Sequence, residues 1–162
     1  MRFEGETALH GLDGEARKFH GEGRAPKSLY GPGASARVVI EAASIKTGNF
    51  LRDAVMRKST LEAEKYPEVV FQVDGLAPEG NPPPPPGPMR LILSGRLSLH
   101  GVTKEKRFPI TVERREEGFV VSGKFSLKLS EHRIPDPSLF FNKVRDEVAA
   151  EFRFTAVAVP EK

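Results

Sequence analysis

The sequence predicts an all-β protein, in which eight antiparallel strands close into a barrel with one or two short helices. Hydrophobic and polar residues alternate along most of the chain, and only residues 49–65 have the spacing of apolar residues that is typical of a helix. The length of 162 residues suits a single domain of this size. Eight antiparallel strands commonly enclose room for one small ligand.

The clearest alternation covers residues 89–99, where apolar residues and one glycine occupy the odd positions and Ile92 alone breaks the pattern. Similar alternation covers residues 108–112, 119–129 and 148–154. One apolar face is typical of a strand in a half-buried antiparallel sheet. We therefore expect four strands in the second half of the chain.

The first half of the chain alternates less regularly. Strands are expected at residues 3–9, 15–23, 37–42 and 69–73, which brings the total to about eight. The interval between the last two strands is longer than the others and lacks alternation. Its residues instead follow the spacing of a helix.

Asn49 is a favourable helix cap, and a short helix is expected over residues 50–57. Thr60 is expected to cap a second helical turn over residues 61–65. This second turn should end at Tyr66, because a residue that precedes proline avoids the helical region.

Residues 77–88 form a proline-rich segment, in which Pro82–Pro86 are consecutive. Five prolines favour an extended polyproline II conformation. We interpret the segment as a stiff, solvated hairpin loop, because strand-like sequence resumes directly after it. A docking site for the aromatic groove of a partner protein is the less favoured interpretation. Residues 1–162 are therefore expected to form a single domain.

Several positions that the alternation turns towards the barrel interior hold small residues, namely Gly5, Gly95, Gly123 and Ala150. Small side chains near the barrel axis would leave volume for a ligand. Alternatively, Gly95 and Gly123 mark bulges or bends in strongly coiled strands. The spacing favours neither interpretation over the other.

Composition and charge argue against several classes of protein. The net charge is only +3, and the basic residues are spread along the chain, whereas a nucleic-acid-binding protein usually has a basic stripe. No apolar run of about 18 residues predicts a transmembrane segment. The chain has no cysteine, which removes disulfides and thiolate metal ligands. Met1–Glu4 do not begin a signal peptide, so we expect an intracellular protein or a mature exported one.

No motif predicts an enzyme. The sequence contains no G-x-S-x-G or H-E-x-x-H motif, no P-loop and no G-x-G-x-x-G fingerprint. His10 and His20 could face each other across a hairpin and bind a metal. Two unrelated surface histidines are the favoured interpretation, and we expect no catalytic residue, no metal and no cofactor.

Three segments resemble the YceI-like family and follow its order and approximate spacing. They are residues 42–49 with Arg52–Asp53, Glu64–Pro67 running into Val70–Phe71, and Gly95–Lys104. The pattern over Leu129–Val148 also resembles the last hairpin of the family. The Glu-Lys-Tyr-Pro and Leu-His-Gly-Val-Thr-Lys sequences within them are specific when they occur together. The resemblance extends from about Val38 to the carboxyl end.

The resemblance implies a lipocalin-like barrel with a helix at one end and a long apolar tunnel. It also implies that the tunnel binds an amphiphilic lipid, typically a polyisoprenoid quinone or a polyprenyl lipid, which the protein carries or stores. Members of the family are often exported to the bacterial periplasm, and some are cytoplasmic. The expected partner is therefore a lipid, and a homodimer is compatible with this expectation.

The tunnel should be lined by inward-facing apolar residues of the strands. The expected set is Leu91, Leu93, Leu97, Phe108, Ile110, Phe119, Val121, Phe125, Phe152 and Phe154. Phe50, Val55 and Phe71 are expected to close the helical end, and Phe140 and Phe141 to lie at a loop. Ordinary core packing is the alternative role for each of these residues.

A polar headgroup should lie near the mouth of the tunnel. Arg52, Arg57 and Lys104 are candidates to contact it, although solvation at the surface is the favoured role for each. The alternative function is that of a β module with a filled core, which docks a protein through the proline-rich loop or through an exposed strand edge.

Overall fold

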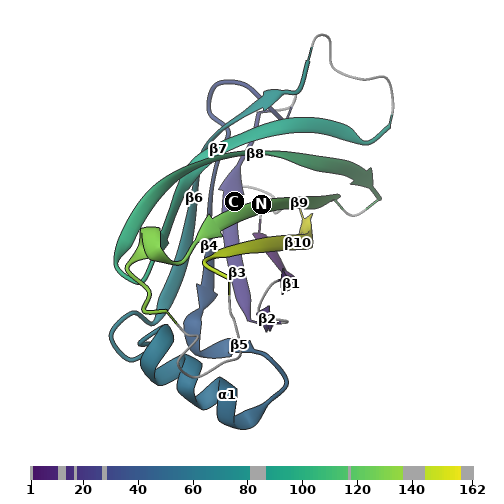
Figure 1. The fold of residues 1–162 in the computed structure, drawn as a ribbon. Coiled ribbons are helices and arrows are strands. Elements are labelled where there is room, and N and C mark those ends of the chain that lie inside the picture. Colours follow the sequence, from purple (N-terminus) through teal and green to yellow (C-terminus); the bar gives the residue numbers. More distant parts are fainter. Residues whose placement is uncertain are drawn as a thin grey trace.

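The computed structural model describes residues 2–10, 14–16, 18–26, 29–80, 87–116, 118–136 and 145–157, and for residues 2–10 it describes the backbone (Figure 1). The strands are β1 (Arg2–His10), β2 (Gly14–Ala16), β3 (Phe19–Arg24), β4 (Ser35–Glu41), β5 (Ile45–Lys46), β6 (Glu68–Pro78), β7 (Met89–Leu99), β8 (Val102–Arg115), β9 (Gly118–Lys128) and β10 (Glu147–Val157). The helical segments are η1 (Ala42–Ser44), α1 (Phe50–Val55), η2 (Met56–Thr60) and η3 (Ser130–His132).

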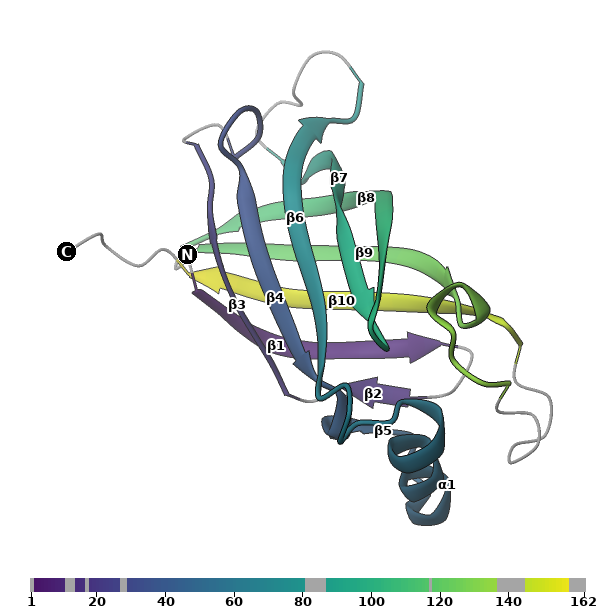
Figure 2. The ribbon, with the colours of Figure 1, turned by 90° about the vertical axis from the view of Figure 1, so that its left-hand side faces the viewer.

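Eight of the described strands form a closed antiparallel ring. They are neighbours in the order β1, β3, β4, β6, β7, β8, β9 and β10, and β10 pairs with β1 along all nine residues of β1. Figure 2 shows the strands curling around a common interior. The predicted eight-stranded barrel is therefore confirmed.

The two short strands lengthen the barrel at the end that carries the helix (Figure 2). Residues Arg2–Glu4 of β1 pair with β3, whereas Thr7–Leu9 pair with β2, and β2 pairs in turn with β5. The single strand expected over residues 15–23 is thus present as two strands that pair with different halves of β1.

The helical segment begins as predicted and ends differently. The Asn49 side-chain oxygen accepts a hydrogen bond from the Arg52 amide at 3.1 Å, which caps α1. The helix then continues into the wider turn of η2, in which the Leu61 amide donates to the Met56 carbonyl oxygen at 2.7 Å. Thr60 is the last residue of η2, so the expectation that it caps a new helical turn is wrong. The Ala63 amide, which a capping Thr60 side chain could accept from, donates instead to the Arg57 carbonyl oxygen at 2.8 Å.

The inward glycines do not leave open space. A side-chain carbon at Gly95 would clash with the Gln72 carbonyl oxygen and lie 2.8 Å from the Phe71 ring. One at Gly123 would lie 2.7 Å from the Phe152 ring. The interpretation that these two positions leave volume for a ligand is therefore wrong, because neighbouring backbone and aromatic rings already occupy it.

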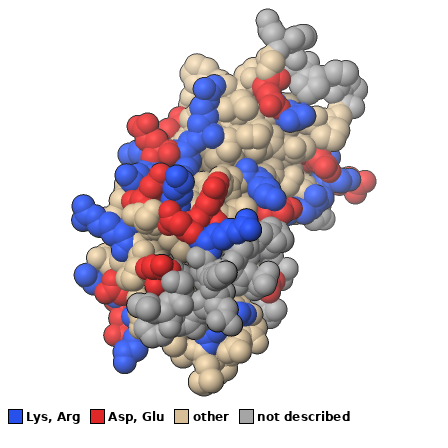
Figure 3. Space-filling model, in the orientation of Figure 1, with Lys and Arg blue, Asp and Glu red and all other residues tan. Residues whose placement is uncertain are grey.

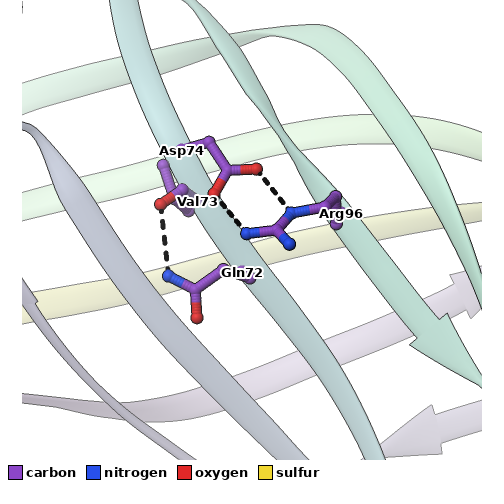
Figure 4. Close-up of polar contacts among 4 residues, drawn as sticks. All are labelled: Gln72, Val73, Asp74 and Arg96. Carbon is purple, nitrogen blue, oxygen red and sulfur yellow. Dashed lines mark hydrogen bonds and ion pairs between the residues drawn. The ribbon is translucent and has the colours of Figure 1, made fainter.

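A β-bulge lies opposite Gly95. The register of β6 against β7 shifts between Val73 and Gly75, which leaves Asp74 as the extra residue. The Asp74 carboxylate accepts two hydrogen bonds from the Arg96 guanidinium, both at 2.8 Å (Figure 4). The bend that the sequence associates with Gly95 thus belongs to the facing strand, and Arg96 ties it to β7.

The proline-rich segment connects neighbouring strands. β6 and β7 pair in antiparallel fashion, and the Glu79 amide donates to the Arg90 carbonyl oxygen at 3.0 Å just before the connection. Residues 81–86, which include most of the prolines, lie outside the described residues.

The wall of the barrel is incompletely paired between β8 and β9. Their register runs from Arg115 opposite Gly118 to Ile110 opposite Gly123. Beyond that point, Val102–Pro109 of β8 pair with β7, and Lys124–Lys128 of β9 pair with β10. The two strands therefore separate towards the end that carries η3.

Candidate ligand-binding site

Among the described residues, the barrel surrounds an elongated apolar cavity with a volume of about 250 Å³. At the helical end it is lined by Ile45, Met56 and Leu61, and at the other end by Leu29 and Phe119. Its charged lining residues within the described chain are Arg24 and Glu151, and both are solvent-exposed. The interior surface therefore offers hydrocarbon contacts and very few hydrogen-bonding groups.

The cavity follows the barrel for most of the length of β7. Leu91, Leu93, Leu97 and Leu99 all line it, and each is buried. At about 3.3 Å per residue, the eight steps from Leu91 to Leu99 span roughly 26 Å. A cavity that is long, narrow and apolar fits an extended hydrocarbon chain better than a compact polar molecule.

Phenylalanine rings form much of the cavity wall. Phe108 stacks on Phe125 with 4.8 Å between the ring centroids, and its edge meets Phe71 at 5.7 Å and Phe152 at 6.1 Å. Phe152 in turn stacks on Phe154 at 5.9 Å. These rings come from four strands that are distant in sequence, and their contacts hold the wall together around the cavity.

Most of the residues expected to form a tunnel lie together in this cavity. The residues of that set that line it are Leu91, Leu93, Leu97, Phe108, Ile110, Phe119, Val121, Phe125, Phe152, Phe154 and Phe71. Phe50 and Val55 are not among the lining residues, and Phe50 is 79% exposed on α1. Met56 and Leu61 occupy the helical end in their place. Phe140 and Phe141 lie outside the described residues.

Sequence reasoning missed other lining residues. Phe19 on β3 is buried against the cavity, and its ring meets Phe154 at 5.8 Å. Leu129 and Ile134 line the helical end from the segment that contains η3. Phe19, Gly21 and Gly23 alternate with the polar residues His20, Glu22 and Arg24, and this pattern could have identified Phe19 as an inward residue. Leu129 ends the alternation over residues 119–129 but lies just beyond β9, and Ile134 stands outside any strand, where alternation gives no signal.

Two of the headgroup candidates, Arg52 and Arg57, lie on the helical segment, whereas Lys104 lies on a strand. The Arg52 guanidinium donates to the Thr47 hydroxyl at 2.7 Å and to the Thr47 carbonyl oxygen at 2.8 Å, which fixes it at the start of α1. Arg57 is half-buried on η2, and Lys104 is exposed on β8. None of the three lines the cavity.

Arg52 belongs instead to a cluster of hydrogen-bonded polar groups around the buried Asp53, and this cluster anchors the helix α1. The Asp53 carboxylate accepts hydrogen bonds from the Thr47 amide and hydroxyl, both at 2.7 Å, and Asp53 is only 8% exposed. Burial raises the pKa of Asp53, but the Thr47 hydrogen bonds and the charges of Arg52 and Arg57 outweigh it and lower the pKa below its ordinary value. This family-like segment therefore has a structural role at the end of the barrel.

A second polar cluster joins three further segments. The His100 Nε2 atom lies 2.6 Å from a Glu62 carboxylate oxygen, and its Nδ1 atom lies 3.2 Å from the His132 carbonyl oxygen. The Tyr66 ring lies 4.5 Å from the His100 ring. A side-chain carbon at Gly101 would stand 2.7 Å from Tyr66, at a backbone φ of 73° that favours glycine. The Glu-Lys-Tyr-Pro and Leu-His-Gly sequences therefore meet here as packing partners.

His132 completes this cluster from η3. Its side chain is fully buried, and its Nδ1 atom donates towards the carbonyl oxygens of Val102 at 3.1 Å and Leu99 at 3.3 Å. Burial lowers the pKa of His132, and the two carbonyl contacts offset this only partly. The ring is therefore neutral in the fold, and it fastens η3 to the turn between β7 and β8.

The structure also separates the two histidines considered for a metal site. His20 on β3 lies opposite Glu4 of β1, six residues before His10. Six strand residues span roughly 20 Å, so the two backbones do not face each other across a hairpin. Among the described residues, no group of three or more potential metal ligands is present.

The outer surface mixes charges of both signs. Figure 3 shows lysine, arginine, aspartate and glutamate side chains interspersed over the visible face. None of the described helices is both long and apolar enough to cross a membrane.

Comparisons with known proteins agree with the fold. The model of the YceI-like domain matches residues 2–156. No curated protein sequence matches the chain.

Similar solved structures include BcnA of Burkholderia cenocepacia, with a TM-score of 0.76 and 20% identity over 96% of each chain. The YCEI protein of Campylobacter jejuni has a TM-score of 0.73 and 16% identity over 92% of this chain and 86% of that one. A polyisoprenoid-binding domain from Saccharophagus degradans, implicated in plant cell wall breakdown, has a TM-score of 0.71 and 17% identity over 98% and 94%. Likenesses at these identities establish the barrel fold.

Proposed function

Because the chain belongs to the YceI-like family, we propose that its barrel binds a long apolar lipid of the isoprenoid type, as a polyprenyl chain or as the tail of a quinone. The observation that carries this proposal is the shape and chemistry of the cavity, which is roughly 26 Å long and lined almost entirely by hydrocarbon side chains. The similarity of the fold to the polyisoprenoid-binding domain from Saccharophagus degradans supports it.

The driving force in this proposal is removal of hydrocarbon from water. Each buried methylene contributes about 0.8 kcal/mol, so a chain with ten buried carbons gains roughly 8 kcal/mol before the cost of immobilising it. No directional contact is needed for this gain. The width and length of the cavity would then determine which chains fit, and branched isoprenoid methyl groups would pack against the phenylalanine wall.

The proposed role is binding, carriage or storage, without catalysis. Catalysis on a bound substrate needs an acid, base or nucleophile held against the reacting atoms. The polar side chains that line the cavity in the described residues are Arg24, Ser35 and Glu151, and all three are solvent-exposed. None is held inside the cavity, where the chain of the lipid would lie.

A cavity-filling variant tests the proposal. Ala36 on β4 lines the cavity, and Ala77 on β6 is exposed, so Ala36→Phe and Ala77→Phe make the same substitution inside and outside the barrel. Each purified protein is extracted with organic solvent, the extract is analysed by mass spectrometry, and binding of added geranylgeraniol is measured. Wild type and Ala77→Phe should retain lipid, and Ala36→Phe should lose most of it. The absence of both co-purified lipid and geranylgeraniol binding in wild type would overturn the proposal.

A further inference from the structure

The helix α1 turns an apolar face outwards. Phe50 is 79% exposed and Leu51 is 74% exposed, and no other large hydrophobic side chain among the described residues is as exposed as either. Ala54 and Val55 follow them by four positions each, which places them one turn along the same side of the helix, and both are half-buried. These four residues form what we call the outer apolar face.

The fold does not account for the exposure of this face. The opposite side of the helical segment is the one that packs on the barrel, because Asp53, Met56 and Thr60 are all buried. Met56 also lines the helical end of the cavity. Phe50 and Leu51 therefore contribute little to the core, and an exposed pair of large apolar side chains is typical of a surface that meets a partner or a membrane.

The outer apolar face lies on a projection. Both views of the ribbon show α1 standing clear of the strands at one end of the barrel (Figures 1 and 2). The lower tip of the space-filling view, where Figure 1 places α1, is made of uncharged residues (Figure 3). A flat surface that approaches this end of the molecule therefore meets the helix before it meets the strands.

Basic groups accompany the outer apolar face. Arg52, Arg57 and Lys58 lie on the same helical segment, and Lys58 is exposed one turn beyond Ala54. The one acidic residue of α1 and η2 is Asp53, whose carboxylate is buried and accepts hydrogen bonds from Thr47. The helical segment therefore presents hydrocarbon and positive charge to its surroundings.

The charges next to the segment do not reverse this balance. On its amino-terminal side, the exposed Lys46 lies opposite Glu15 of β2. On its carboxyl-terminal side, two of the next three acidic residues contact a basic residue and one precedes a lysine in the sequence. These pairs are Glu62 with His100 at 2.6 Å, Glu68 with Arg37 at 3.6 Å, and Glu64 with Lys65.

From these observations we propose that the outer apolar face docks the protein on the surface of an anionic phospholipid bilayer. Phe50 and Leu51 insert among the lipid headgroups, and the basic side chains of the segment, Lys58 above all, contact lipid phosphates. An amphipathic helix with aromatic and aliphatic residues on one side and basic residues beside them has the composition that binds such a surface. The inference goes beyond the proposed function, because docking needs no lipid in the cavity.

The size of the face favours a bilayer over a protein partner. A protein interface of standard size buries about 800 Å² on each partner, which four residues on a projecting helix do not supply. A bilayer makes no such demand, because a few side chains inserted among the headgroups already leave water and gain from nearby anionic lipid. Docking in this way brings the helical end of the cavity towards the bilayer.

The test measures co-sedimentation of the full chain with vesicles made of equal parts of phosphatidylcholine and phosphatidylglycerol. Wild type should bind these vesicles about tenfold more tightly than vesicles of phosphatidylcholine alone. The double variant Phe50→Ala/Leu51→Ala should bind the anionic vesicles about tenfold more weakly than wild type, because the inserted hydrocarbon is lost. Lys58→Glu should weaken binding by a similar factor, because it reverses one charge at the bilayer.

Matched controls carry the same kinds of change near the β8–β9 turn. Val157, opposite Gly118, is the other exposed large hydrophobic residue of the described chain, and Arg114, opposite Phe119, is also exposed. Val157→Ala and Arg114→Glu should bind anionic vesicles as wild type does. All of the substituted side chains are exposed, so each variant should unfold at the urea concentration of wild type.

Tryptophan fluorescence locates the contact directly, because the chain contains no tryptophan of its own. The emission of Phe50→Trp should shift to shorter wavelength when anionic vesicles are added, and acrylamide should quench it less. The emission of Val157→Trp should not change under the same conditions. The opposite pattern, with a shift only in Val157→Trp, would overturn the proposal by placing the contact at the other end of the barrel.

Three further results would also overturn the proposal. The first is failure of wild type to bind anionic vesicles, and the second is equal binding by wild type and Phe50→Ala/Leu51→Ala. The third is self-association of wild type that this double variant abolishes in sedimentation velocity, which would assign the face to a second copy of the chain. Binding of geranylgeraniol in the absence of vesicles is measured separately, so its loss would contradict the proposed function and leave the docking result to stand on its own.

Discussion

The Phe152 ring lies over Gly123, and a side-chain carbon at position 123 would stand 2.7 Å from the ring and 3.0 Å from the Ile110 side chain. The register of β9 against β10 places Gly123 and Phe152 opposite each other. The Phe71 ring of β6 is similarly close to Gly95, at 2.8 Å from a side-chain carbon at that position, although the register places Val73 opposite Gly95. Glycine on one strand therefore makes room for an aromatic ring of another, and the cavity lies inside the wall that these rings build.

The two glycines should differ in their tolerance of a methyl group. In Gly95→Ala the new carbon meets the Gln72 carbonyl oxygen, which is backbone, whereas in Gly123→Ala it meets the tip of a phenylalanine ring. Backbone yields less readily than a side chain, so Gly95→Ala should cost about 3 kcal/mol of unfolding free energy and Gly123→Ala about 1 kcal/mol. Urea denaturation of both variants measures this. An equal or smaller cost for Gly95→Ala would contradict the packing described for β6 and β7.

Asp53 should stabilise the helical end in its ionised form. Its pKa is lower in the fold than in the unfolded chain, so its stabilising contribution is complete above the unfolded pKa of about 3.9 and is lost as the pH falls through the folded value. Asp53→Asn should reduce the unfolding free energy at neutral pH by about 2 kcal/mol, because hydrogen bonds from Thr47 to a charged acceptor are weakened.

This difference between wild type and Asp53→Asn should shrink as the pH falls below about 4. Urea denaturation as a function of pH provides the measurement, with Glu64→Gln as an exposed control that should show little change. A difference that stays constant across the acidic range would argue that the carboxylate charge plays no part in anchoring α1.

Alternation predicted the barrel well where one face of a strand is apolar throughout. β7 is present with its expected bounds, and β9 and β10 differ from expectation by a few residues. β8 was predicted from residue 108 and begins at Val102. Its first part contains Lys104 and Lys106 on the face of the strand that carries Phe108, so period-two alternation of hydrophobicity is absent there although the backbone is a strand.

The sequence predicted those lining residues of the cavity that lie on strands with alternating hydrophobic and polar residues. Inward residues of β7 to β10 line it as a group, because one face of each strand must meet the interior. The helical end was predicted less well. Met56 lines the cavity and Phe50 does not, since the wide turn of η2 changes which residues face the barrel. The separation of β8 from β9 beyond Ile110 and Gly123 depends on how whole strands pair, which no local pattern encodes.

The buried histidine of η3 should make stability depend on pH near neutrality. Burial lowers the pKa of His132, so below the unfolded value of about 6.5 the unfolded chain binds more protons than the fold. The contribution of His132 is therefore complete above about pH 6.5 and decreases as the pH falls towards the folded pKa. The unfolding free energy of wild type minus that of His132→Asn should be larger at about pH 7.5 than at about pH 5. His20→Asn, at an exposed position on β3, is the control.

Phe50 and Phe71 should differ in their contributions to stability and to lipid binding. Phe71 lines the cavity and its ring meets Phe108 and Phe125, whereas Phe50 is 79% exposed. Phe71→Ala should cost about 3 kcal/mol of unfolding free energy and weaken geranylgeraniol binding, because it removes wall contacts. Phe50→Ala should change the unfolding free energy by less than about 0.5 kcal/mol and leave binding unchanged. Urea denaturation and lipid titration measure both quantities. Loss of binding in Phe50→Ala with stability preserved would show that α1 contacts the lipid, and that the ligand extends beyond the cavity at the helical end.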